Sequence, residues 1–187
     1  MFIYEYGLGI LLGLSLAGPP GSVNSVIANE SLKSRLHGMG VGFGAMTADS
    51  ILFFIVYLTN GIITETILKV IYIIGGIFML YLGLSVLRSR MPSKTRKGNY
   101  FLGLSMGLTN PFQIIWWFTA GFFLLKELSI FSVTGLFSGI VIWISIFPYV
   151  IWRFGTGYEK YIKIGSATII FGFAIYILYV GTVLIIG

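Results

Sequence analysis

The stretch at positions 18–24 is the first place in the sequence where residue types and spacing predict chemistry. It reads Gly-Pro-Pro-Gly-Ser-Val-Asn and lies in a run, 6–29, that contains no charged residue. Two successive prolines remove two backbone donors and clash with the preceding turn, and the flanking glycines loosen the chain, so a helix should break here. The half that follows would present free N–H groups and the positive end of its dipole to a carboxylate. A simple proline kink is the alternative. The candidate residues of this site are Pro19, Pro20, Gly21, Ser22 and Asn24.

A second break is predicted at Asn110–Pro111, inside another uncharged run, 99–125. The pair lies about ten residues from the start of that run, which at about 1.5 Å per residue is near the middle of a membrane. Carbonyl groups released by Pro111 and the Asn110 side chain offer acceptors for an ammonium group or a cation. The alternative is an ordinary proline kink whose Asn side chain is satisfied locally.

Asp49 is the ionisable residue that lies deepest inside an apolar run, 38–60. An unpaired carboxylate near the middle of a membrane costs several kcal/mol or becomes protonated, so such residues are usually functional. Asp49 is therefore a candidate for binding a substrate amine or for relaying a transported proton. The alternative is a hydrogen bond between helices to a Ser, Thr or Asn side chain.

Enzyme and metal-site signatures are missing from the sequence. The chain has no cysteine and one histidine, and it contains no HExxH, GxSxG or Walker motif. A second carboxylate deep in an apolar run, which an aspartyl protease would need, is also missing. We therefore expect no enzyme, no catalytic residue, no metal site and no cofactor.

Composition identifies the elements that must position these residues. Of 187 residues 57% are hydrophobic and 10% are charged, whereas soluble domains carry about a quarter charged residues. Uncharged runs this long must be helices in lipid, because only helices satisfy all their backbone groups within one segment. Six membrane-spanning helices are predicted within 6–29, 38–60, 70–87, 99–125, 128–152 and 164–187.

Charge between the runs predicts their orientation. Ten of the twelve Lys and Arg residues fall on one side of a six-span arrangement, and only Lys69 and Lys126 fall on the other. The positive-inside rule places the ten in the cytoplasm, together with the loop 88–98, and both termini outside. The basic excess thus records orientation in a plasma membrane, with lipid and not nucleic acid as the expected partner. The first run lacks the features of a cleaved signal peptide and is expected to remain.

Tryptophan follows a separate rule. Trp116, Trp117 and Trp152 are expected near a membrane interface, where amphipathic indole rings accumulate. Trp143, in the middle of a run, is expected to line a cavity or to pack.

The two halves of the chain resemble one another. The segment 13–20, Gly-Leu-Ser-Leu-Ala-Gly-Pro-Pro, parallels 103–111, Gly-Leu-Ser-Met-Gly-Leu-Thr-Asn-Pro, at a separation of 90 residues, and Leu-Tyr-Leu-Gly at 80–83 parallels Leu-Tyr-Val-Gly at 178–181. Three spans in each half force opposite topologies, so we predict an all-α, single transmembrane domain over 1–187. It comprises two inverted three-helix repeats, about 1–90 and 99–187, with helices one and four broken, an architecture of secondary transporters.

The same motifs resemble the lysine-exporter (LysE/RhtB-type) family of amino-acid translocators. The first-span motif of that family, often written PPGPVN, reads Pro-Pro-Gly-Ser-Val-Asn at 19–24, its Gly-rich second span with a buried Asp matches 40–49, and its Asn-Pro matches 110–111. The third-span pattern at 80–88 also matches. Ser22 replaces the second proline of Pro-Gly-Pro, which affects the expected geometry of the break more than membership.

The resemblance implies export of amino acids or related small zwitterions from the cytoplasm, driven by the proton gradient. Combined with the inverted repeats, this predicts a secondary transporter working by alternating access, with the substrate carboxylate at the first break and its amine at Asn110 and Asp49, and with a homo-oligomer possible. Efflux of a small ion or metal cation is one alternative, although a single buried carboxylate makes a poor divalent site. A non-transporting membrane scaffold subunit is the other.

Overall fold

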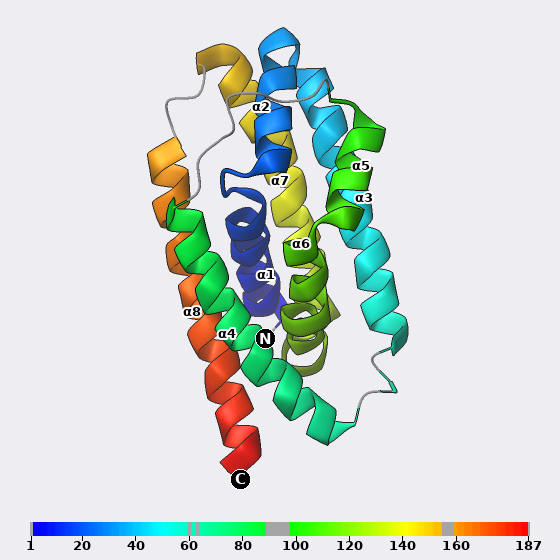
Figure 1. Cartoon of the computed structure of the whole chain (residues 1–187), viewed down its shortest axis with the longest axis vertical. Helices are drawn as coiled ribbons and strands as arrows, with labels where there is room; N and C mark the ends of the chain where they lie inside the picture. The colour runs from blue at the N-terminus through cyan, green and yellow to red at the C-terminus, as the bar shows by residue number, and fades with distance from the viewer. Residues whose placement is uncertain (1, 60, 63, 89–97, 155–158, 187) are drawn as a thin grey trace.

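All regular secondary structure in the described part of the chain is helical. The computed structural model describes residues 2–59, 61–62, 64–88, 98–154 and 159–186 (Figure 1). Nearly all of the predicted loop 88–98 therefore lies outside the described residues. In chain order the elements are α1 (Phe2–Ala17), α2 (Ser22–Lys33), α3 (Arg35–Thr59), α4 (Glu65–Arg88), α5 (Tyr100–Thr109), α6 (Pro111–Trp116), the π-helical turns η1 (Trp117–Gly121) and η2 (Leu124–Leu128), α7 (Ile130–Phe154) and α8 (Glu159–Ile186).

Four of these helices, α3, α4, α7 and α8, are long and apolar enough to cross a membrane. A fifth candidate span is the pair α1 and α2, which meet at an angle of 80°. The protein is therefore a multi-pass membrane protein. The break predicted within 18–24 is present, since α1 ends at Ala17 and α2 begins at Ser22.

The second predicted break is also present. Asn110 ends α5 and begins α6, with Pro111 as the first residue of the new helix. Proline fits that position because its missing N–H would have no partner in a first turn. Beyond α6 the helix widens into η1 and η2, and short π-helical segments of this kind are frequent at functional sites.

Three long seams hold the helices together: α1 packs against α7, α3 against α5, and α4 against α8 (Figure 1). Small residues make the first two seams very close. A Cβ atom at Gly44 on α3 would collide with the carbonyl oxygen of Tyr100 on α5, and one at Gly135 on α7 would collide with that of Tyr6 on α1. Each seam therefore requires glycine at this point, as in small-residue packing of membrane helices.

A tyrosine closes each of these two seams in the same way. The Tyr100 hydroxyl donates a hydrogen bond of 2.8 Å to Thr47 Oγ1, and the Tyr6 hydroxyl donates one of 2.8 Å to Ser138 Oγ. Thr47 and Ser138 each lie three residues after the glycine of their seam. The contacts of α1 with α7 are thus repeated in those of α5 with α3.

Gly44 offers a direct test of this packing. Gly44→Ala should lower the free energy of unfolding by about 1–3 kcal/mol, because the new methyl group forces the two backbones apart. Gly40→Ala, one turn earlier on the same helix and with open space around it, should be neutral or stabilising, since alanine favours a helix by about 1 kcal/mol over glycine. Thermal unfolding of the detergent-purified variants measures both. Equal effects would contradict the proposed contact.

Candidate functional site

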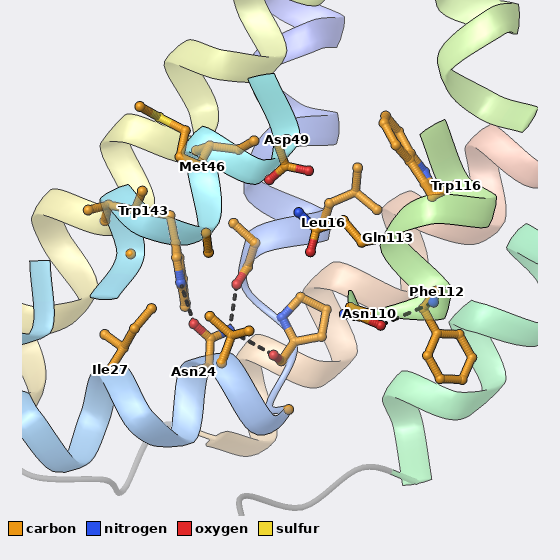
Figure 2. A pocket seen from close by; sticks show the side chains of 18 of the residues that line it. Leu16, Asn24, Ile27, Met46, Asp49, Asn110, Phe112, Gln113, Trp116 and Trp143 are labelled. Atoms are coloured by element: carbon orange, nitrogen blue, oxygen red, sulfur yellow. Dashed lines mark hydrogen bonds between the residues drawn. The ribbon is translucent and has the colours of Figure 1, made fainter. Parts of the chain in front are cut away.

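A cavity of about 220 Å³ lies between the two breaks (Figure 2). Its wall includes residues from α1, α2, α3, α4, α6, α7 and α8, and the two breaks both reach it. Both breaks and the carboxylate of α3 thus meet at one place, although nearly ninety residues separate the breaks in the sequence. The predicted site residues on the wall are Pro19, Gly21, Ser22, Asn24, Asp49 and Asn110. Pro20 and Pro111 are not part of the wall and shape the breaks from behind it.

Asn24 organises the first break. Its side-chain amide group donates to the carbonyl oxygens of Ala17, at 2.5 Å, and Pro19, at 2.8 Å, which the interrupted helix leaves without helical partners. Its side-chain oxygen accepts a hydrogen bond of 3.2 Å from Nε1 of Trp143 on α7. Asn24 is 6% exposed. The side chain therefore uses both ends to fix the break, and its role is to position α1 and α2 more than to offer a free amide.

The first turn of α2 faces the cavity. Gly21 is the N-cap residue and, having no side chain, leaves the helix start uncapped, while Gly21, Ser22 and Val23 line the wall. The N–H groups of a first helical turn have no partners within the helix. They therefore form an anion-attracting end of the cavity, reinforced by the helix dipole.

Asp49 supplies the negative end. Nε1 of Trp117 donates a hydrogen bond of 2.7 Å to Oδ1 of Asp49, and the Gln113 side chain lies beside the same carboxylate. The Asp49 and Gln113 side chains point toward one another across the cavity (Figure 2). Asp49 is therefore held by α6 and η1, which together follow the second break, and not by the Ser, Thr or Asn partner that the sequence suggested as the alternative.

The second break is held by its own side chain. Oδ1 of Asn110 accepts a hydrogen bond of 3.1 Å from the backbone N–H of Phe112, which caps α6. The Asn110 side chain therefore begins a helix, as expected for the N-cap preference of Asn. Its place on the cavity wall leaves the residue within reach of a bound solute.

Two tryptophans were wrongly expected at an interface. Trp116 is 4% exposed and Trp117 is 0% exposed, so both belong to the protein core. Trp116 lines the cavity, and its Nε1 is the one buried side-chain polar atom without a hydrogen-bond partner in the described part of the chain. Trp143 lines the cavity, as one of its two predicted roles required.

Gln113 and Trp117 are site residues that the sequence analysis missed. A signal was available, because positions 113 and 117 are four residues apart and share one helical face that starts at the Asn110 break. A helix that starts at the break and turns this face toward the interior places both side chains near Asp49. Tryptophan pairs in apolar runs are instead commonly assigned to interfaces.

The described wall combines one carboxylate with neutral polar groups and apolar side chains. Asp49 is the ionisable group of the wall as the structure describes it. The remaining polar groups are amides, a hydroxyl, backbone N–H groups and the indole N–H groups of Trp116 and Trp143, among mostly apolar side chains. No group of three or more His, Asp or Glu residues suited to a metal ion is found in the described ranges.

Comparison with known proteins gives two results. The model of the protein family described as LysE type translocator matches residues 14–181. The chain is also 31% identical over 155 residues to the "Putative amino acid efflux protein YcgF" of Bacillus subtilis (strain 168), which covers 72% of this chain and 74% of that protein. No solved structure matches the chain.

The contact between Trp117 and Asp49 yields a second prediction. Trp117→Phe keeps an aromatic ring but removes the Nε1 donor, so the buried carboxylate loses a partner, and we expect stability to fall by about 1–3 kcal/mol. Trp152→Phe is the matched control, because Trp152 is 51% exposed on α7. Thermal unfolding of the two variants in detergent compares them. A Trp117→Phe protein as stable as Trp152→Phe would contradict the role given to this hydrogen bond.

Proposed function

The chain belongs to the LysE type translocator family, and from this premise we propose that it exports amino acids or related small zwitterions out of the cytoplasm. The observation that carries the proposal is the cavity between the two breaks, which joins a carboxylate to an uncapped helix start. The relative that aligns with 72% of this chain bears the name "Putative amino acid efflux protein YcgF".

Each charged end of an amino acid has a complementary group in this cavity. The α-carboxylate of the substrate faces the first turn of α2 at Gly21 and Ser22, where backbone N–H groups and the helix dipole favour an anion. The α-ammonium group faces the Asp49 carboxylate, with the Asn110 side chain close to the second break as a further acceptor. Pro19, Pro20, Asn24 and Pro111 hold the breaks that keep these groups in place.

Asp49 is also the residue that couples transport to protons. A carboxylate surrounded by apolar side chains is costly when charged and unpaired, so binding of the substrate ammonium group and binding of a proton compete for Asp49. Exchange of one for the other on the two sides of the membrane links export to the proton gradient. Trp117 and Gln113 position the carboxylate during this exchange.

Inverted repeats with alternating access complete the proposal. The seams support an equivalence of Tyr6 with Tyr100, 94 residues apart, and of Gly44 with Gly135, 91 residues apart. The same two spacings relate two further close contacts. A Cβ atom at Gly9 would meet Ser132, and one at Gly103 would meet Val41; Gly9 and Gly103 are 94 residues apart, and Val41 and Ser132 are 91 residues apart. The sequence motifs alone aligned Gly13 with Gly103. A separation of 94 residues aligns Gly13 with Gly107 instead.

The repeats require a sixth span, which we assign to α5, α6, η1 and η2 together. These elements extend over 100–128 and correspond to the broken pair α1 and α2 in the other half. The arrangement keeps both termini outside the cytoplasm and the loop 88–98 inside, in the plasma membrane, following the distribution of Lys and Arg.

The competing functions fit less well. A divalent cation prefers several oxygen or nitrogen ligands of suitable charge, whereas the described wall offers one carboxylate. A scaffold subunit has no need of a cavity at which two broken helices meet. Among the described wall residues no hydrogen bond pairs the Ser22 hydroxyl, as a nucleophile, with Asp49, as a base. The protein is therefore proposed to act as a transporter and not as an enzyme.

Asp49→Asn tests this function. In proteoliposomes with an imposed pH gradient, the native protein should drive amino-acid flux, and Asp49→Asn should reduce this coupled flux at least tenfold, because the amide neither binds an ammonium ion strongly nor titrates. Glu127→Gln makes the same chemical change at an exposed position and should retain flux. Unchanged coupled flux in Asp49→Asn would overturn the assignment of this residue.

A further inference from the structure

Asp49 and Ile140 both line the cavity, and the proposed repeat relates their two positions. A shift of 91 residues relates α3 to α7, as Gly44 and Gly135 do. The same shift relates Asp49 to Ile140, and both residues line the cavity. The position that holds a carboxylate in one repeat therefore holds an isoleucine in the other.

Apolar side chains surround this second position. Ile140 is 7% exposed, and Leu136 and Ile144, which lie one turn before and after it on α7, also line the cavity. Residues from α4 and α8 extend the same apolar wall, among them Leu82 and Ile170. Burial of aliphatic groups against such a surface is favourable in proportion to the area removed from water.

The charged groups of the cavity wall limit which amino acids can bind with all their charges compensated. One carboxylate and one helix start balance one ammonium group and one carboxylate of a solute. A second ammonium group, as in lysine, would face no second carboxylate on the described wall, and a second carboxylate, as in glutamate, would face no cation. An uncompensated charge in a low-dielectric site is strongly unfavourable.

The volume of the cavity indicates the size of the solute. An apolar cavity of about 150 Å³ holds benzene, which has six non-hydrogen atoms, so in proportion a cavity of about 220 Å³ holds a solute of roughly nine, the size of leucine or methionine. A larger aromatic amino acid such as tryptophan would extend beyond this volume through the open part of the cavity.

We propose that the protein transports neutral amino acids with an aliphatic side chain about the size of leucine or methionine, and that Ile140 forms the part of the cavity that receives this side chain. The proposal rests on the proposed function, since it assumes that the cavity is the transport site. Asp49 then selects for the ammonium group and Ile140 for the side chain, from equivalent positions of the two repeats.

Counterflow into proteoliposomes loaded with leucine tests the substrate class with the full-length protein. Unlabelled leucine, methionine and valine should compete with labelled leucine at least tenfold better than lysine, glutamate or tryptophan. The amine 3-methylbutylamine and the acid 4-methylpentanoate, which each lack one charged group of leucine, should compete poorly. Lysine or glutamate competing as well as leucine would overturn this inference while leaving amino-acid export intact. No transport of any amino acid would overturn the proposed function itself.

Variants of Ile140 test the assigned position. Ile140→Asp adds a second carboxylate and should raise the ratio of lysine to leucine transport at least tenfold. Ile140→Ala should shift preference toward phenylalanine, whereas Ile151→Ala, a similarly buried isoleucine on the same helix that does not line the cavity, should not. Thermal unfolding identifies any variant that fails to fold, and if Ile140→Asp fails, the comparison of the two alanine variants decides. Unchanged selectivity in a folded Ile140→Asp protein, or equal selectivity of Ile140→Ala and Ile151→Ala, would overturn the assignment.

Discussion

The cavity depends on the side-chain amide of Asn24. A helix that breaks inside a membrane leaves carbonyl oxygens with neither a helical donor nor water, and each such group costs several kcal/mol. The side-chain amide of Asn24 donates hydrogen bonds to two of them, those of Ala17 and Pro19, and so stabilises the break as a defined turn. Because its oxygen is held in turn by Trp143, the turn is fixed to α7 as well. The start of α2 can then face the cavity with its N–H groups uncapped.

Close seams allow the rest of the molecule to carry these breaks. Gly9, Gly44, Gly103 and Gly135 lie where the paired backbones are so near that no side chain fits between them, and the tyrosine hydroxyl groups add one hydrogen bond to each seam. Lipid provides little hydrophobic drive for helix association, so packing and hydrogen bonds of this kind must supply it. The short helices on either side of each break are therefore held in place by the helices packed against them.

The sequence predicted where the chain leaves regular helix better than it predicted which way helices face. Prolines and Asn at 18–24 and at Asn110–Pro111 have direct consequences for backbone hydrogen bonding, so both breaks could be located. Helix rotation is harder to predict, because a helix that contacts lipid on one side and protein on the other is apolar all round. The burial of Trp117 against Asp49 and the seam hydrogen bonds of Tyr6 and Tyr100 depend on rotation, and neither was predicted.

The two halves share their packing but not their chemistry. Tyrosine, glycine and hydroxyl positions of the seams recur from one half to the other, whereas the first break is closed by an amide that reaches back to carbonyl groups and the second by an Asn that caps forward. Indole donors also differ, since Trp143 holds Asn24 while Trp117 holds Asp49. A repeated framework can keep two equivalent seams around one cavity, and a dipolar solute requires unlike groups at its two ends. In the proposed transporter the unlike groups are Asp49 and Ile140 on the cavity wall, while the close contacts at Gly44 and Gly135 stay alike and keep the helices packed.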